Sequence, residues 1–381
     1  MANIIVLVFL IACIGYQYLK GNLVKAFSGL IAVLVASFIG FAMFEPLAGF
    51  IMSHDIGLEF QTSARWLHPL VFVMLFAIIF ALEQAGLVKL LVNAPTLGVW
   101  PDRIGRAVCG LFHGLVLAGV LFTTVFLTPL TVKLPYQRFE SAAQIPDKPK
   151  AALFAPADFT IGFFKMVSNG SLSGKRSFSA LHPDILSERY LNKFSNAGET
   201  QSFTSSAALS VPRKAAVWPA PEKLTDNNAN PVTAPSGDKI MVVRLGLRRN
   251  ALREAVPFTL SQVKILCKLQ QYAQSATTGS SRSIYPAGYF SGPARVALKE
   301  PDELIRLGSG DFEESVRWLD FCVYVPSGYI PVMAGFKLNN IVEIPEPVSL
   351  AKAPVIEPFE EKKPAETKEK TKKKRQNRNN R

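Results

Sequence analysis

Four long apolar stretches dominate the first third of the chain. They contain few charged side chains and cover residues 3–19, 23–44, 67–82 and 107–130. The second and fourth reach the ~20 residues that a helix needs to cross ~30 Å of hydrocarbon, and the others reach it when Tyr18 and Trp66 extend them at the interface. A soluble helical core would need a polar face for solvent, and these stretches have none. The pattern therefore predicts four transmembrane helices over residues 1–130.

The charges between these stretches predict how the helices are oriented, because Lys and Arg favour the cytoplasmic side of short loops. The first and third connections together carry Lys20, Lys25, Lys89, Arg103 and Arg106. The only basic residues of the second connection and of the segment after the fourth stretch are Arg65, Lys133 and Arg138. We therefore expect both termini outside the cytoplasm, although the two counts become equal when Lys148 and Lys150 are included.

Small residues recur every fourth position in the second and fourth stretches. They are Ala32, Ala36 and Gly40 in the second, and Gly110, Gly114 and Ala118 in the fourth. Small residues on one helix face let two backbones approach closely, which drives helix association in lipid. The two faces are expected either to pack the four helices of one chain together or to join copies into a homo-oligomer.

The third connection and the fourth stretch also share a pattern of glycines and charges. Residues 98–114 contain, in order, Gly98, the pair Asp102-Arg103, and the G-x-x-x-G of Gly110 and Gly114. In the first connection, two basic residues flank a glycine and a short spacer, as Lys20, Gly21 and Lys25. Together with the four closely spaced spans of residues 1–130, these features resemble the CvpA (colicin V production protein) family.

The resemblance implies a multi-pass protein of the bacterial inner membrane, linked to colicin V production and envelope maintenance. The chain departs from the family at Arg106, where a Gly is common, and at Ala26, where an acidic residue often stands. We expect Asp102 to cap the N-terminus of the fourth helix and favour its dipole, while Arg103 reaches lipid headgroups or a neighbouring carboxylate. His113, one turn into that stretch, is a speculative functional residue, because ionisable groups inside a membrane are functional candidates.

The chain changes character after residue 130. Residues 239–344 contain runs with alternating apolar positions, which are typical of β-strands, at 239–247, 262–269, 318–325 and 330–338. They predict a small β-rich soluble domain, either a sandwich or an open barrel, which lies in the periplasm if both termini are outside. Cys267 and Cys322 fall in two of these strands. They are either core residues or, in an oxidising compartment, partners in a disulfide.

Residues 131–238 are rich in Pro, Ser and Ala and are expected to be a connector with short helices. The apolar segment 159–167 predicts a short helix that lies along the membrane surface or docks on the following domain. Residues 200–238 carry five prolines and are expected to be an irregular linker.

Composition agrees with a chain of unlike parts. The chain has 381 residues, a mean hydropathy of +0.21 and a net charge of +13. Residues 1–130 carry six basic and five acidic side chains, so most of the positive charge lies after the last span. Residues 345–381 are rich in Lys and Glu and predict a disordered tail. Its basic cluster at 372–375 is suited to anionic lipid headgroups or cell-wall polymers, and without interleaved aromatic residues no nucleic acid is expected to bind.

Signatures of catalysis, cofactors and metals are missing from the sequence. Some relatives attach a trypsin-like protease to such a membrane region, but a protease needs a Ser nucleophile in a Gly-rich loop and a His base. The only His after residue 130 is His182, which precedes a Pro outside the predicted β-rich domain. The four His residues are scattered and do not pair with Cys or carboxylates at metal-ligand spacing.

The sequence therefore favours a non-enzymatic membrane protein. We expect it to act in envelope maintenance or colicin V export through contacts with lipids or with an envelope protein that the sequence does not identify. A small oligomeric channel or transporter subunit is the main alternative, although its spans carry little charge. An enzyme of unrecognised type is the weakest alternative.

Overall fold

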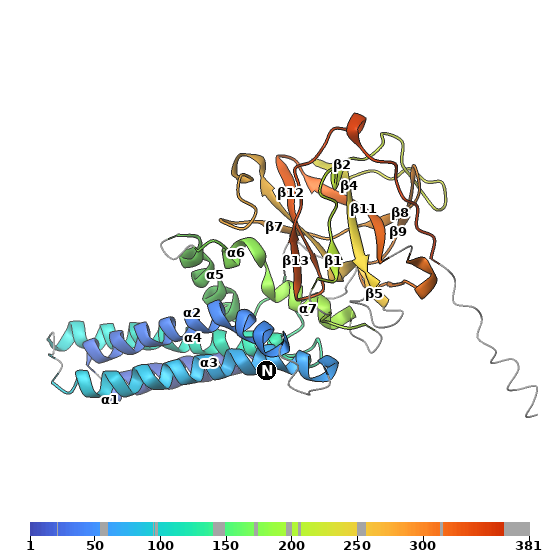
Figure 1. The fold of residues 1–381 in the computed structure, drawn as a ribbon. Helices are drawn as coiled ribbons and strands as arrows, with labels where there is room; N and C mark the ends of the chain where they lie inside the picture. Colours follow the sequence, from blue (N-terminus) through green and yellow to red (C-terminus); the bar gives the residue numbers. More distant parts are fainter. Residues whose placement is uncertain are drawn as a thin grey trace, which may run out of the picture.

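Four long helices lead into a β-rich domain in the computed structural model (Figure 1). The structure describes the following residues: 1–20, 22–53, 60–93, 95, 98–139, 149–170, 174–195, 200–204, 207–249, 257–312 and 315–361. The helices lie side by side as an elongated bundle, and the β-rich domain sits at the end of the bundle where the N-terminus lies. We call this the domain end. The opposite end, which holds the α1–α2 and α3–α4 connections, is the loop end.

The predicted spans are confirmed as helices long and apolar enough to cross a membrane, so the chain is a multi-pass membrane protein. They are α1 (Ala2–Lys20), α2 (Leu23–Ser53), α3 (Phe60–Leu90) and α4 (Val99–Leu127). α2 is longer than predicted because it continues through Pro46, and α3 extends beyond the predicted stretch 67–82 at both ends, with Pro69 inside it. Proline is tolerated inside membrane helices where neighbouring groups satisfy the freed backbone.

Three short helices, which confirm the helical part of the predicted connector, join the bundle to the β-rich domain. They are α5 (Pro156–Asn169), α6 (Phe178–Leu181) and α7 (Ile185–Ser195). α5 lies against the side of the bundle, where Phe163 stacks on Phe38 of α2 at 5.4 Å and Phe159 on Phe112 of α4 at 6.2 Å between ring centroids. Phe159 and Met166 remain exposed on its outer face. The segment 159–167 is therefore helical and packs along the sides of α2 and α4.

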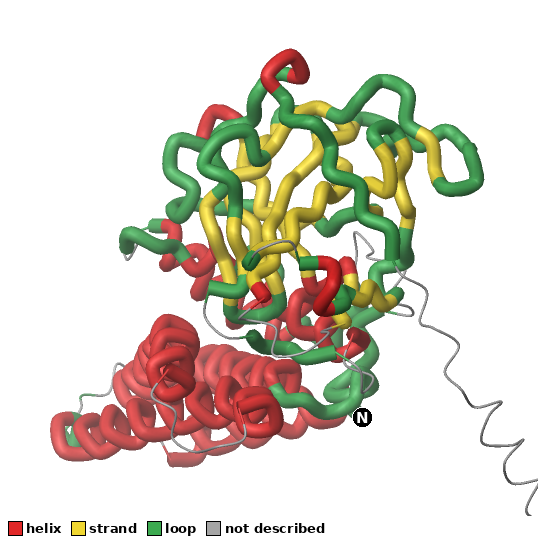
Figure 2. The backbone as a smooth tube through the Cα atoms, turned by 45° about the vertical axis from the view of Figure 1, so that its right-hand side comes forward, coloured by secondary structure: helices red, strands yellow, loops and turns green. Residues whose placement is uncertain are grey.

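The predicted β-rich domain is confirmed, and it consists of open sheets (Figure 2). In the described residues, one sheet has the order β1-β4-β11-β8-β9-β3, with β2 paired to β4. A second sheet has the order β13-β12-β6-β7, and β10 pairs with β5. The strands are β1 (Leu209–Ser210), β2 (Val217–Pro219), β3 (Thr225–Asp226), β4 (Asp238–Arg248), β5 (Pro257–Thr259), β6 (Val263–Leu269), β7 (Arg282–Ile284), β8 (Gly288–Gly292), β9 (Arg295–Leu298), β10 (Leu304–Arg306), β11 (Val316–Pro326), β12 (Tyr329–Phe336) and β13 (Asn340–Glu343).

One apolar core fills the space between the two larger sheets. Val243 and Phe321 come from one sheet, and Ile265 and Phe336 come from the other, each no more than 1% exposed. Alternating apolar positions along the long strands produce this arrangement, because successive side chains point to opposite faces of a sheet. Cys267 and Cys322 are free thiols, so the disulfide alternative is not realised.

Two predicted boundaries need correction. β1, β2 and β3 lie within residues 200–238, which were expected to be linker, because Leu209, Val217 and Trp218 bury their side chains against the sheets. Residues 345–361 were expected to belong to the tail, but they fold back onto the domain. Phe359 is 2% exposed there. The basic cluster at 372–375 lies outside the described residues.

A buried ion pair explains why this last segment stays on the domain. Arg244 donates to Asp320 from Nε at 2.7 Å and from Nη2 at 2.6 Å. The same guanidinium donates to the Val355 carbonyl at 2.6 Å and to Glu357 Oε1 at 3.1 Å. The segment thus supplies acceptors that a buried guanidinium requires.

Candidate functional site

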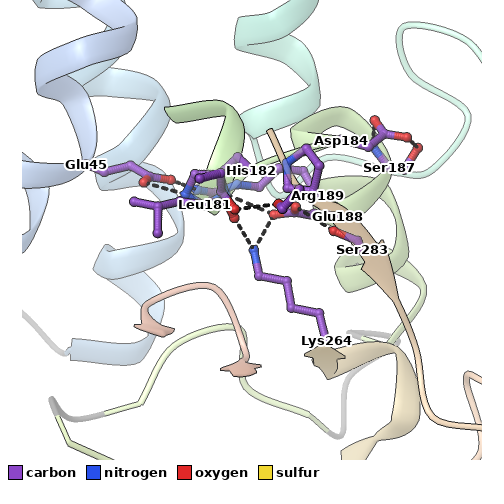
Figure 3. A network of polar contacts seen from close by, with 12 residues as sticks. Glu45, Leu181, His182, Asp184, Ser187, Glu188, Arg189, Lys264 and Ser283 are labelled. Carbon is purple, nitrogen blue, oxygen red and sulfur yellow. Dashed lines mark hydrogen bonds and ion pairs between the residues drawn. The ribbon is translucent and has the colours of Figure 1, made fainter. Parts of the chain in front are cut away.

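Charged side chains meet in a buried network between the bundle and the β-rich domain (Figure 3). His182 lies at its centre, between α6 and α7. Its Nε2 is 2.9 Å from Glu45 Oε2, near the domain end of α2, and its Nδ1 is 2.9 Å from Glu188 Oε2 of α7. The imidazole thus connects a membrane helix to the connector.

Two further cations complete the network. Lys264 of β6 donates from Nζ to Glu188 Oε2 at 2.6 Å and to the Leu181 carbonyl at 3.2 Å. Arg189 of α7 donates to Glu45 Oε1 at 2.8 Å. Two carboxylates and three basic groups, contributed by α2, the connector and the β-rich domain, therefore meet here. We refer to Glu45, His182, Glu188, Arg189 and Lys264 as the junction network.

Local sequence explains why the connector presents these groups. α6 stops before His182, because a residue that precedes a proline disfavours the helical conformation. The backbone of His182 has φ −131° and ψ 69°. Asp184 then accepts a hydrogen bond from the Ser187 backbone N–H at 3.1 Å, which satisfies a free donor in the first turn of α7. Because α6 stops just before His182 and α7 begins shortly after it, Glu188 and Arg189 lie next to His182.

Burial makes the junction network an electrostatic unit. His182, Glu188, Arg189 and Lys264 are each at most 6% exposed. Burial alone would raise the pKa of Glu188, but Lys264 and His182 outweigh it and lower that pKa to about 2. Burial alone would lower the pKa of His182, but Glu45 and Glu188 raise it above its ordinary value despite the charge of Lys264. Paired opposite charges thus keep buried groups ionised.

The network leaves little space for a substrate. The cavity beside Glu188 and Lys264 has a volume of about 10 Å³, which is room for about one water molecule. Among the residues that the structure describes, no three His, Cys, Asp or Glu side chains are placed to hold a metal ion. The geometry is suited to joining parts of the chain.

A second ionic contact supports the first from the side of α5. Arg138, which is 2% exposed, donates from Nη2 to Asp158 Oδ1 of α5 at 2.9 Å. Its Nε donates to Ser187 Oγ of α7 at 3.2 Å. The segment that leaves α4 is thus bound to the connector helices α5 and α7.

At the loop end, Asp102 acts on a different helix from the one expected. It lies in the first turn of α4, but its Oδ1 accepts from the Leu23 backbone N–H, the first residue of α2, at 2.7 Å. The expectation that Asp102 caps its own helix is therefore wrong. The close approach of α2 to α4 gives this carboxylate a free N–H that α4 does not supply.

Arg106, rather than Arg103, completes this contact. Its Nε is 3.0 Å from Asp102 Oδ2, and its Nη1 donates to the Tyr18 carbonyl near the C-terminus of α1 at 2.8 Å. Asp102 and Arg106 together thus hold the end of α1 and the start of α2; we call this pair the loop-end clasp. Arg103 is exposed. The position where the chain departs from the CvpA pattern is the one that carries the contact.

The glycines of the fourth span pack within the chain. A Cβ on Gly110 would lie 2.7 Å from Ile14 Cα, and one on Gly114 would lie 2.9 Å from the Phe9 carbonyl oxygen. The second small-residue face is also occupied, since a Cβ on Gly40 would lie 3.3 Å from the Phe72 ring. These contacts realise the intramolecular alternative. A homo-oligomer would need other surfaces.

The remaining predicted positions are dispersed. Gly98 precedes α4 with a φ of +98°, a conformation that favours glycine. Lys25 is exposed, and its backbone N–H donates to Asn22 Oδ1 at 2.9 Å. Gly21 and the side chain of Lys20 lie outside the described residues. The structure therefore does not gather the motif residues into one site.

His113 lies inside the bundle and is 8% exposed. A Cβ on Gly29 of α2 would lie 3.6 Å from Gln17 Nε2 and 4.0 Å from the His113 ring. Polar groups of α1 and α4 thus face the same point of α2. Within the described part of the chain, His113 Nδ1 has no hydrogen-bond partner.

Sequence reasoning missed the junction network. In the sequence, Glu45 directly follows the predicted span 23–44, and His182 is an isolated histidine before a proline. No spacing links residues 45, 182, 188 and 264, so the only available signal was a charged residue close to an apolar span. No protein-family model, curated protein or solved structure matches the chain.

Proposed function

We propose that the chain is a non-enzymatic platform of the bacterial inner membrane, similar to the CvpA family, that presents its β-rich domain in the periplasm. It acts in envelope maintenance or in colicin V export through contacts with lipids or an envelope protein. The junction network carries this proposal. It holds the domain on the bundle by ion pairs in place of a flexible linker.

The number of connections supports a fixed domain. Glu45 belongs to a membrane helix, Glu188 to the connector and Lys264 to a central strand of a sheet. Moving the domain away from the bundle would break the ion pairs that join these three parts of the chain. A domain held in this way presents the same surface to a partner at all times, and a scaffold requires this.

A small channel is the alternative, and one observation favours it. Gln17 of α1 and His113 of α4 face the same point of α2 inside the bundle, and polar groups at membrane depth often mark ion or proton paths. Purified protein reconstituted in vesicles tests this. Ion flux that disappears in a His113→Leu variant would replace the platform with a channel.

Complementation tests the platform directly. We would delete the gene and measure sensitivity to detergent and colicin, then restore the full chain, Glu188→Ala or Glu188→Gln at equal membrane levels. The platform predicts rescue by the native chain, loss of rescue by Glu188→Ala, and an intermediate result for Glu188→Gln, which keeps a hydrogen-bond acceptor. Full rescue by Glu188→Ala would contradict it.

The side of the membrane on which the β-rich domain lies can be measured separately. A Gln271→Cys substitution places a thiol on the exposed surface of the β-rich domain. A membrane-impermeant maleimide should label it in intact spheroplasts, whereas a Lys89→Cys substitution at the loop end should react only after lysis. The reverse pattern would place the domain in the cytoplasm.

A further inference from the structure

A cavity of about 400 Å³ lies beside the junction network, at the domain end of the bundle. Residues 126–132, at and after the end of α4, form one wall. Arg65 of α3 and Arg189 and Lys193 of α7 contribute cationic groups. None of the described residues that line the cavity is acidic. The cavity therefore concentrates positive charge.

The depth of the cavity follows from the packing of α1 on α4. Gly110 lies against Ile14 and Gly114 against Leu10, so the two helices run in opposite directions. Continuing by whole turns brings Phe122 level with Ala2, the first residue of α1. At 1.5 Å per residue, Leu127 lies about 7 Å beyond that level. The cavity wall thus stands where the polar headgroups of a bilayer begin.

The lining combines two chemistries. Phe126, Leu127 and Val132 provide apolar surface, whereas Arg65 and Lys193 provide charge. Lys193 is held in place, since its Nζ donates to the Val125 carbonyl at 3.0 Å and lies 5.8 Å from the centre of the Phe126 ring. An apolar wall beside fixed cations matches a phospholipid, in which an anionic phosphate lies close to apolar acyl chains.

A buried cation next to the lining residue Leu338 adds a second observation; it lines the small neighbouring cavity beside Glu188 and Lys264. Lys337 is 4% exposed, and its Nζ has no hydrogen-bond partner among the described residues. Leu338, the next residue, lines the cavity. Burial and the nearby charge of Arg65 lower the pKa of Lys337 to about 7, and burial lowers that of Lys193 to about 8. A bound anion would relieve this accumulation of like charge.

We propose that this cavity binds the headgroup phosphate of an anionic phospholipid from the surrounding leaflet, with Arg65 and Lys193 as its ligands. Arg189 is committed to Glu45 and contributes charge rather than a direct contact. The site goes beyond the platform role, because a domain held by the junction network needs no lipid. Its failure would leave the platform intact.

Lipid titration of the full chain in a neutral detergent tests the site. We would measure binding by native mass spectrometry and thermal protection with phosphatidylglycerol, phosphatidylcholine and inorganic phosphate. Phosphatidylglycerol should bind at least tenfold more tightly than phosphatidylcholine. Equal binding of the two lipids would overturn the proposal. Inorganic phosphate that protects as well as the lipid and displaces it would assign the site to free phosphate instead.

Charge variants locate the binding. Arg65→Gln with Lys193→Gln should weaken phosphatidylglycerol binding at least tenfold, whereas Lys89→Gln with Arg103→Gln, which removes two exposed cations at the loop end, should leave it unchanged. If both pairs of substitutions weakened phosphatidylglycerol binding equally, the attraction would be non-specific and the proposed site would be wrong.

A gentler variant covers the case in which the first pair does not fold. Thr131 is exposed on the cavity wall, so Thr131→Glu adds a negative charge without removing a buried cation. It should weaken phosphatidylglycerol binding severalfold. Gln271→Glu adds the same charge on a distant surface of the β-rich domain and should have no effect. Unchanged binding in Thr131→Glu would count against the site.

Discussion

The two ends of the helix bundle use charge differently. At the loop end, Asp102 and Arg106 are four residues apart and partly exposed, with 11% and 15% of their side chains accessible. They bond to backbone groups at the ends of α1 and α2. At the domain end, Glu45, His182 and Lys264 come from distant parts of the chain. The side chains of His182 and Lys264 are 3% and 7% exposed, whereas that of Glu45 is 25% exposed at the edge of the cluster.

The difference shows what each set of charges stabilises. The loop-end clasp satisfies N–H and C=O groups that every helix terminus leaves unpaired. Its charges stay near water, so removing one costs little. The junction network satisfies its own members, and removing Glu188 leaves Lys264 buried without a carboxylate, which is strongly destabilising. The domain end should therefore be the more sensitive to mutation.

The largest expected effect is that of Glu188→Ala. The substitution leaves Lys264 and His182 buried without their shared carboxylate, and breaking a buried pair typically costs about 3–5 kcal/mol. Thermal unfolding in detergent should show a large loss of stability. Protease should also cleave between the bundle and the β-rich domain. A loss no greater than that of Asp102→Ala would erase the contrast between the ends.

A smaller effect is expected between the two ends, where α1 packs on α4. Gly114→Ala places a Cβ 2.9 Å from the Phe9 carbonyl oxygen, and such overpacking costs about 1–3 kcal/mol. Gly15→Ala is the matched control, because a Cβ there meets no atom within 4 Å. It should be neutral or slightly stabilising, since alanine favours helix. Equal effects of the two would argue against the close α1–α4 contact.

Asp102→Ala should cost about 1 kcal/mol, the usual effect of losing a helix cap. Asp102→Asn retains an oxygen that can accept from the Leu23 N–H but loses the ion pair with Arg106, so its loss should be smaller. Unfolding temperatures of the two variants measure the difference. If Asp102→Asn were as damaging as Asp102→Ala, the ion pair rather than the cap would dominate.

The smallest expected effect is the pH dependence of His182. Its raised pKa means that the imidazolium stabilises the fold below pH ~6.5, and this contribution is lost as pH rises through the folded pKa. Lys337 acts in the opposite sense, because its lowered pKa makes stability rise between pH 7 and pH ~10.5. In a Lys337→Met background, stability should fall as pH rises from 6 to 8, below the range in which the lowered pKa of Lys193, about 8, raises stability. His182→Gln should flatten that slope, and a persistent slope would point to another group.

Much of the architecture could be predicted from the sequence because it depends on local patterns. Transfer into lipid is roughly additive along a helix, so uninterrupted apolar stretches were enough to predict four spans. Small residues at four-residue spacing predicted close helix packing, and Gly110 and Gly114 pack closely against α1. Alternation along 318–325 and 330–338 predicted strands that became β11 and β12.

The short strands and the folded-back end were harder to predict from the sequence. β1 to β3 have two or three residues each, too few for an alternating pattern, and prolines surround them. Phe359 lies in a segment rich in Glu and Lys that reads as a tail. Its burial depends on Arg244, far earlier in the chain, which holds Glu357 and the Val355 carbonyl.

By itself, the sequence determined which segments enter the membrane, where small residues allow helices to touch, and that a β-rich domain follows. Only the tertiary structure decided which charges pair. Glu45, His182, Glu188 and Lys264 each look like an ordinary solvated residue in the sequence. Their pairing depends on folding contacts between a membrane helix, the connector and a strand that lie far apart in the chain, and Coulomb attraction in a buried site follows distance in space rather than along the chain. The same reason directed Asp102 to cap α2 instead of its own helix.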